Sequence, residues 1–268
     1  MSTDEVLIDR TGDVVGVTLN RPQRHNAFTT PMYDAIEGLV AELAQDEAAR
    51  VVVFRGAGGK AFAAGNDIGE FTALATGDDV VRYESRVQDL IASLAALPQV
   101  TIAAVDGLCV GGGLAFATAC DLRVATRASR FGYPIARSLG NALSRTLLER
   151  CVTVFGASVT RQMLLTSRLV DAPRAYEVGA LLAVVDDSQA LEVEVQTIVE
   201  GLLAAAPLTL EATKRQLAGI TTIRPRDDDD DALLRQVYSS DGFREGVRAF
   251  LAKEKPRFDL VHERLDRS

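Results

Sequence analysis

The stretch CVGGGLAFATACDL (residues 109–122) places three consecutive glycines between an apolar run and a segment typical of a buried helix. The run at 100–105 before it predicts a buried strand. Glycines after a strand let the backbone come close to a ligand, and they expose amide N–H groups at the start of the next helix. No acidic residue follows until Asp121. The glycines therefore predict either a backbone approach to a ligand or a tight, closely packed turn without one.

The familiar glycine-rich nucleotide motifs do not fit this stretch. A dinucleotide fingerprint needs GxGxxG after the first strand and an acid about 20 residues later, and Gly111–Gly113 lacks that spacing. The sequence contains no GxxxxGK[ST] phosphate loop and no GxSxG nucleophile elbow. The spacing thus argues against nucleotide binding of these kinds and against a serine hydrolase.

A second strand followed by a glycine-rich loop occurs earlier in the chain. Val51–Arg55 predicts a buried strand, and GAGGKAFAAGNDI (56–68) predicts the loop. Such alternation with helices predicts parallel strands joined by crossovers. An N-terminal hairpin turns at 11–13, a helix begins with a Thr30 cap and Pro31, and 127–140 is expected to be irregular. Further helices are predicted at 143–155, 158–165, 173–178, 188–204, 207–219, 231–239 and 241–253.

Composition narrows the class of protein. The formal net charge of -8 argues against a nucleic-acid partner, which needs a basic face. No apolar run reaches the ~20 residues of a membrane span, and the acidic start is unlike a secretory signal. Three scattered cysteines without a CxxC pair indicate reduced thiols and a cytoplasmic location. The acidic run at 226–231 is interpreted as solvated acids at the N-terminus of a helix rather than as a metal site.

Several motifs, taken together, resemble one known family. They are NRPQRHNAF (20–28), AFAAGNDI (61–68), AAVDGLCVGGGLAFATACDLRVA (103–125) and FGYP (131–134). In order and spacing they resemble the crotonase family, the enoyl-CoA hydratase/isomerase superfamily. The later segments LLTSRLVDAPRAYEVGALLAVV (164–185) and SSDGFREGVRAFLAKEKPRF (239–258) extend the resemblance over nearly the whole chain.

The resemblance implies an α/β crotonase (ClpP-like) fold, in which ββα units coil into a superhelix. Residues 1–190 would form this core, and 191–268 a helical C-terminal region for trimerisation and pocket closure. A homotrimer, or a hexamer of two trimers, is implied. The expected partner is an acyl-CoA thioester, with no cofactor beyond coenzyme A and with no metal. An activity in fatty acid metabolism, as a lyase or an isomerase, goes with that substrate.

The family holds the thioester oxygen with two backbone amides, which stabilise the anion that develops during reaction. By position these resemble the N–H groups of Asn66 and Gly112, and the side chain of Asn66 offers a further donor. His25 matches the coenzyme A end and is expected to contact it or solvent. Lys253 and Lys255 would reach its phosphates or lie in solvent. The implied substrate-binding positions are Arg24, His25, Ala27, Ala63, Ala64, Gly65, Asp67, Ile68, Gly111, Tyr133 and Asn141.

This sequence departs from the family where hydratases carry acid/base groups. The two hydratase glutamates match Ala115 and Ile135, and a third acidic position used by other members matches Leu143. Apolar side chains cannot transfer protons, so hydration by two glutamates is not expected. Glu149 is the acid expected nearby, and its spacing from Arg145 favours an ion pair on a helix. Cys109 is interpreted as a packing residue.

Three functions remain open on the sequence. The chain is either an atypical acyl-CoA isomerase, lyase or hydrolase, or a non-catalytic acyl-CoA carrier or sensor. A scaffold that has lost the ligand is the third. The glycine motifs argue against the scaffold, because glycines without a role destabilise the elements that hold them.

Overall fold

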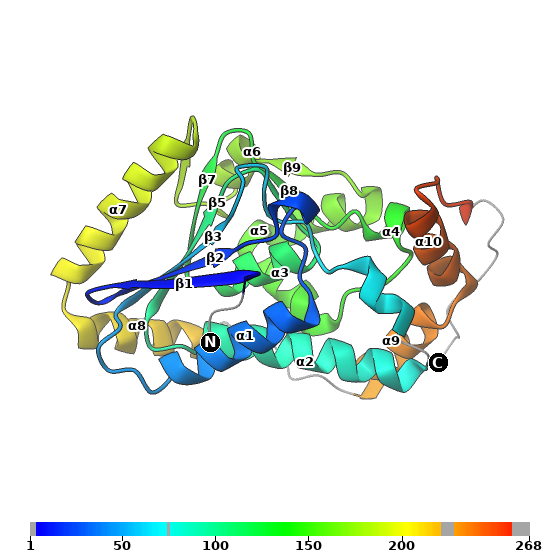
Figure 1. Ribbon diagram of the computed structural model, residues 1–268, viewed down its shortest axis with the longest axis horizontal. Coiled ribbons are helices and arrows are strands. Elements are labelled where there is room, and N and C mark those ends of the chain that lie inside the picture. Colours follow the sequence, from blue (N-terminus) through cyan, green and yellow to red (C-terminus); the bar gives the residue numbers. More distant parts are fainter. Residues whose placement is uncertain (1–3, 74–75, 221–227, 259–268) are drawn as a thin grey trace.

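The computed structural model describes residues 4–73, 76–220 and 228–258, and it centres on a six-stranded sheet (Figure 1). The sheet has the order β1-β2-β3-β5-β7-β10, and only the β1–β2 hairpin is antiparallel. Its strands are β1 (Val6–Thr11), β2 (Val14–Leu19), β3 (Val51–Gly56), β5 (Val100–Val105), β7 (Leu122–Thr126) and β10 (Ala183–Val185). The predicted hairpin and parallel sheet are confirmed.

A second, four-stranded sheet has the order β4-β6-β8-β9. Its strands are β4 (Ala61–Ala63), β6 (Leu108–Val110), β8 (Arg130–Gly132) and β9 (Val170–Asp171). In successive repeats the chain places one strand in the large sheet and the next strand in the small one, as in β3–β4, β5–β6 and β7–β8. This is the ββα arrangement expected of the fold. The segment 127–140, predicted to be irregular, holds β8 and a short helix, which are too brief to show periodicity.

Helices cover the large sheet on both faces (Figure 1). In chain order, the helices of the described residues are η1 (Pro22–Arg24), α1 (Thr30–Leu43), η2 (Ile68–Ala73), α2 (Gly77–Ala95), α3 (Gly112–Ala119), α4 (Ile135–Ser138), α5 (Arg145–Thr166), α6 (Ala172–Glu177), α7 (Ser188–Ala204), α8 (Pro207–Ile220), α9 (Asp228–Tyr238) and α10 (Asp241–Ala252). Successive strand residues point to opposite faces. Val51 and Val53 therefore pack with α7, whereas Val52 and Phe54 belong to the main core with α1 to α3.

Individual residues determine where α1 begins and where α5 is interrupted. The cap of α1 is Thr29 rather than the predicted Thr30, since Thr29 is extended and its hydroxyl accepts the amide of Met32 at 3.3 Å. The hydroxyl of Thr30 donates to Glu70 instead. Gly156 has φ 75° and interrupts α5, in agreement with the two helices predicted there.

The last two helices, α9 and α10, lie at the end of the molecule away from α7 (Figure 1). There α9 packs on α2, and α10 packs on η2. The predicted boundary at 190 falls within α7, which lies on the sheet, so the division into two regions stays a prediction. Of the acidic run, residues 226 and 227 lie outside the described residues, and Asp231 is buried rather than solvated.

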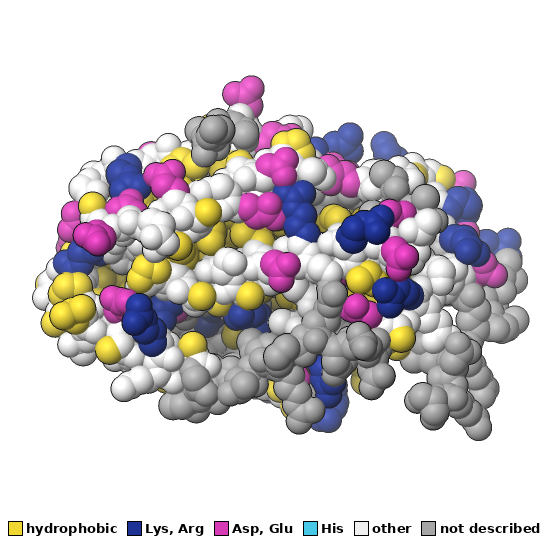
Figure 2. Space-filling model, turned by 90° about the horizontal axis from the view of Figure 1, so that it is seen from below, with side chains coloured by type: hydrophobic (Ala, Val, Ile, Leu, Met, Phe, Trp, Pro, Cys, Tyr) yellow, Lys and Arg dark blue, Asp and Glu magenta, His cyan; other side chains and the backbone are white. Residues whose placement is uncertain are grey.

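The face seen from below carries basic and acidic side chains close together, with hydrophobic side chains between them (Figure 2). Arg86 of α2 joins two acids of α1, with its Nε 2.8 Å from a carboxylate oxygen of Glu37 and a second contact to Asp34. Among the described residues, no single helix is long and apolar enough to cross a membrane, although α7 and α8 together form a pair that reaches that length with a 106° bend.

Candidate functional site

A cavity of about 480 Å³ opens where η1, the loop after β4, α3 and α4 meet. It gathers fourteen positions singled out from the sequence: Arg24, His25, Ala27, Ala64, Gly65, Asn66, Asp67, Ile68, Gly111, Gly112, Ala115, Ile135, Asn141 and Leu143. Most of the further lining is apolar and comes from Val87, Leu139, Ala142, Leu147 and Phe250, among others. Segments far apart in the sequence thus form one cavity with a largely apolar lining and a few polar groups.

Two predicted contact residues lie behind the cavity wall instead. Ala63 is fully buried, and its carbonyl oxygen would lie 2.2 Å from a β-carbon on Gly113. Tyr133 is also fully buried, and burial raises the pKa of its hydroxyl well above the usual range. Neither residue lines the cavity. Both residues pack beside the lining residues, and the expectation that they touch the substrate stays a prediction.

The loop at 20–28 is held by a residue that the sequence analysis passed over, Asn26. Its side chain is fully buried, accepts the amide of Arg21 at 2.9 Å and donates to the carbonyls of Ala57 and Ala61 at 3.0 and 2.7 Å. Asn26 adopts φ 56°, a left-handed conformation that asparagine tolerates better than most residues. Asn26 therefore fixes the loop that carries Arg24 and His25.

Backbone hydrogen bonds then join this loop to the segment around Asn66. The amide of Ala64 donates to His25 at 2.9 Å, and that of Phe28 donates to Gly65 at 2.8 Å. The amide of Asp67 returns to the carbonyl of Phe28 at 2.7 Å. Asn66 therefore lies between two residues, Gly65 and Asp67, that are both hydrogen-bonded to Phe28. These bonds fix the position of the Asn66 amide in the cavity wall.

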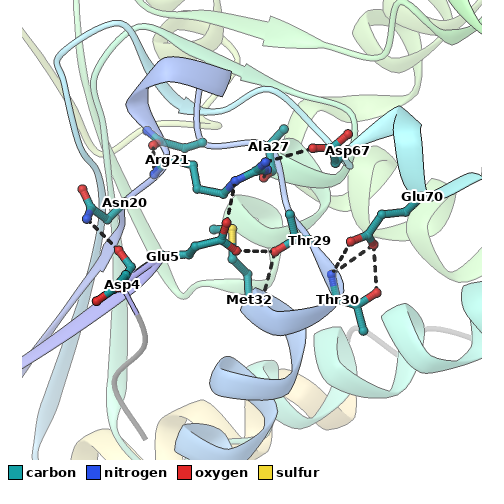
Figure 3. A network of polar contacts seen from close by, with 11 residues as sticks. Asp4, Glu5, Asn20, Arg21, Ala27, Thr29, Thr30, Met32, Asp67 and Glu70 are labelled. Atoms are coloured by element: carbon teal, nitrogen blue, oxygen red, sulfur yellow. Dashed lines mark hydrogen bonds and ion pairs between the residues drawn. The ribbon is translucent and has the colours of Figure 1, made fainter. Parts of the chain in front are cut away.

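Side chains reinforce the same junction (Figure 3). Arg21 lies between Glu5 and Asp67, with N–O distances of 2.9 and 3.0 Å, and donates to the carbonyl of Ala27 at 2.6 Å. Glu5 also accepts the hydroxyl of Thr29 at 2.6 Å. The start of the chain, the loop at 20–28 and the loop at 65–67 are thereby tied together.

Two cavity-lining amides have no acceptor within the described parts of the chain. They belong to Asn66 and to Gly112, the first residue of α3. The first amides of a helix have no partner within that helix, and backbone N–H groups away from water ordinarily find one. A ligand oxygen in the cavity can therefore accept from both.

The side chain of Asn66 lies against Gly112. A β-carbon on Gly112 would sit 2.6 Å from Asn66 Oδ1, which is too close for any other residue without displacement. Asn66 Oδ1 accepts the hydroxyl of Tyr33 at 2.6 Å. Burial, followed by the charge of Glu84, raises the pKa of Tyr33 above its ordinary value, so the hydroxyl stays protonated and donates. The Asn66 amide group is consequently held in one orientation.

The positions that match the family's acidic residues hold no titratable group. Ala115 is buried in α3, Ile135 begins α4, and Leu143 follows, and all three line the cavity. Glu149 does not line it, and forms the predicted ion pair with Arg145 at 3.5 Å.

The cavity nevertheless contains a carboxylate that the sequence analysis missed. Glu84 of α2 lines it and is only 6% exposed. Its Oε1 accepts the hydroxyl of Tyr238 at 2.5 Å, and that hydroxyl accepts from Asn141 Nδ2 at 3.2 Å. A signal existed in the sequence, because Glu84 falls between Val80 and Val87 on the apolar stripe of α2.

The three cysteines are free and buried, as predicted. Burial raises the pKa of Cys120 to about 12 and that of Cys151 to about 11. Burial also raises the pKa of Cys109, further still. All three are therefore packing residues rather than nucleophiles at neutral pH.

A ββα superhelix with an apolar cavity at the N-terminus of a central helix defines a crotonase-type protein. The chain belongs to the enoyl-CoA hydratase/isomerase family, whose model matches residues 9–260.

Individual relatives agree with that assignment. The chain is 27% identical over 267 residues to the short-chain-enoyl-CoA hydratase of Clostridium acetobutylicum, covering 95% of this chain and 97% of the relative. A crystal structure of an enoyl-CoA hydratase/carnithine racemase from Magnetospirillum magneticum is 33% identical, with TM-score 0.79 and 95% of each chain covered. A methylmalonyl-CoA decarboxylase complexed with 2S-carboxypropyl-CoA is 25% identical, with TM-score 0.85, covering 96% of this chain and 98% of the other.

Proposed function

We propose that this protein binds an acyl-CoA thioester and stabilises an enolate-type anion, as an atypical acyl-CoA isomerase, lyase or hydrolase. The observation that carries the proposal is the pair of cavity-lining amides at Asn66 and Gly112, which have no acceptor among the described residues. Preorganised donors of this kind act on charge as it develops, and the loss of one typically costs about 10²–10³ in rate. The coenzyme A portion would lie toward Arg24 and His25 at the exposed mouth of the cavity.

Hydration by paired glutamates is not part of this proposal. Such a reaction needs one group to activate water and another to handle the proton at the α-carbon. Ala115 and Ile135 supply neither. The relatives named as hydratases therefore support the substrate class more strongly than the reaction.

A non-catalytic acyl-CoA carrier or sensor is the second candidate. The apolar lining around Leu139, Leu143 and Leu147 favours it, because an acyl chain would be buried there without a reacting group beside it. The buried carboxyl group of Glu84 in the same cavity favours an enzyme, since a carboxyl group is able to transfer protons.

Titration calorimetry with butyryl-CoA, crotonyl-CoA and longer 2-enoyl- and 3-enoyl-CoAs tests the proposal, with free coenzyme A as the control ligand. Mass analysis of the same mixtures follows turnover. We expect binding that needs the acyl group and no rapid hydration of crotonyl-CoA. Absence of acyl-CoA binding would overturn the proposal. Rapid hydration of crotonyl-CoA would show that the assignment of Ala115 and Ile135 is wrong. Tight binding with no conversion of any substrate would favour the carrier.

A further inference from the structure

We propose that Glu84 is the acid/base group of this site, a catalytic residue that moves a proton on the acyl chain, positioned by Tyr238 and Asn141. The inference rests on the proposed function, because it concerns a thioester bound in the same cavity. It replaces the two missing glutamates by one carboxylate from a different element, α2.

The first support is the position of the carboxylate. Glu84 lines the same cavity as Asn66, Gly112 and Ala115, although it is nearly buried. Its charge acts on the hydroxyl of Tyr33, which in turn contacts Asn66 Oδ1. The carboxylate-bearing residue and the amide pair therefore border one and the same cavity.

The second support is the way in which the carboxylate is held. Burial, and then the nearby charge of Glu84, raises the pKa of Tyr238 well above its ordinary value, so this hydroxyl stays protonated and acts as a donor. It donates to Glu84 Oε1 and accepts from Asn141 Nδ2. Because Asn141 follows α4 and Tyr238 ends α9, the carboxylate is oriented by elements from two distant parts of the chain.

The third support is that a single buried carboxylate suits one reaction class. Glu84 takes a proton from the α-carbon, the C–H bond breaks, and its electron pair moves toward the thioester carbonyl. The resulting enolate oxygen carries the charge that the amides of Asn66 and Gly112 stabilise. The protonated carboxyl then returns the proton to the α-carbon or, in a 3-enoyl chain, to the γ-carbon. The second outcome converts a 3-enoyl thioester into a 2-enoyl thioester and needs no water or oxidant.

Exchange of the α-protons of butyryl-CoA in D₂O tests this step, because it needs only deprotonation and return. Mass spectrometry follows deuterium incorporation, and calorimetry measures the affinity of each variant for butyryl-CoA. We expect Glu84→Gln to lower the exchange rate by about 10²–10⁴-fold, as for loss of a general base, and to keep the affinity of the wild type within about threefold. Glu149→Gln, which removes a carboxylate outside the cavity, is the matched control and should exchange normally.

Tyr238→Phe distinguishes a positioning residue from a packing residue. It retains the ring and removes the hydroxyl, which donates to Glu84 and accepts from Asn141, so kcat for isomerisation of a 3-enoyl-CoA should fall by about tenfold with little change in KM. Should Glu84→Gln fail to fold, Glu84→Asp replaces it. This variant keeps the carboxylate but places it one methylene closer to the backbone of α2, so the exchange rate of the α-protons should also drop.

Three results would overturn the proposal. The first is a Glu84→Gln variant that exchanges the α-protons of butyryl-CoA at the wild-type rate. The Glu84→Asp variant takes its place in this test where Glu84→Gln does not fold. The second is wild-type protein that binds butyryl-CoA but neither exchanges its α-protons nor isomerises a 3-enoyl-CoA, which leaves the carrier function standing. The third is absence of acyl-CoA binding, in which case the proposed function fails as well.

Discussion

Asn66 Oδ1 lies 2.6 Å from the point where a β-carbon on Gly112 would stand. The two residues come from separate ββα repeats, and their backbone amides line the same cavity. The contact explains why glycine is needed at the start of α3: any side chain would push Asn66 away from Tyr33. The glycine at the start of α3 is therefore a packing requirement of the cavity wall.

Gly112→Ala should damage the site through that contact. We expect the affinity for butyryl-CoA to fall by about tenfold, since roughly 1.4 kcal/mol is comparable to one lost hydrogen bond. Calorimetric titration measures this change. Gly201→Ala in α7 is the control, because a β-carbon there meets nothing within 4 Å. Equal affinity of both variants and the wild type would contradict the placement of the thioester oxygen beside Gly112.

Asn26→Ala should destabilise the whole fold. The change removes three hydrogen bonds and leaves the carbonyl of Ala61 without that donor in a buried setting, which should lower the free energy of unfolding by about 2–4 kcal/mol. Urea unfolding measures the effect. Asn20→Ala removes a single exposed bond to Asp4 and serves as the control. A midpoint for Asn26→Ala equal to that of the control would show that the loop is held by other contacts.

Installing the missing acids tests the interpretation of the two apolar positions. The double variant Ala115→Glu, Ile135→Glu should gain measurable hydration of crotonyl-CoA, because both positions line the cavity. The loss of enoyl absorbance follows the reaction. The Gln/Gln double variant has matched size but no base and should stay inactive. Wild-type activity equal to that of the Glu/Glu variant would mean that water is already activated by another group.

The three cysteine thiols should not react with a disulfide reagent in the folded protein. With pKa values raised by burial to about 12 for Cys120 and about 11 for Cys151, and higher again for Cys109, all three remain protonated at pH 8. Since the thiolate is the reactive form, a disulfide reagent should modify no thiol in native protein and three after denaturation. Fast modification of the native protein would show that a cysteine is exposed to solvent.

Much of the fold was predictable because its signals are local. The buried strand at 100–105 and the helix at 188–204 have the predicted bounds, since apolar runs and periodicity mark them directly. Strand β8 and helix α4 escaped prediction because elements of three or four residues show no period. The cap of α1 shifted to Thr29 because the competing hydroxyl of Thr30 is engaged by Glu70, which is distant in sequence.

The residues of the candidate site could be predicted only where they belong to a sequence motif. Asn66 and Gly112 lie in glycine-rich motifs, and the cavity contains both. Glu84 lies in a helix without any motif. Its surroundings depend on α9 packing on α2, which brings Tyr238 to Glu84 and Asn141 to Tyr238. The one sequence signal for Glu84 as a site residue was its position as an acidic residue on the apolar stripe of a predicted helix.

We expect the amides of Asn66 and Gly112 to hold a thioester oxygen together. A crystal structure of the complex with butyryl-CoA, a saturated ligand that cannot be hydrated, tests it most directly. The account predicts the thioester oxygen about 2.7–3.2 Å from both amide nitrogens, with the acyl chain running toward Glu84. A bound acyl-CoA whose carbonyl oxygen lies away from these two nitrogens would contradict it.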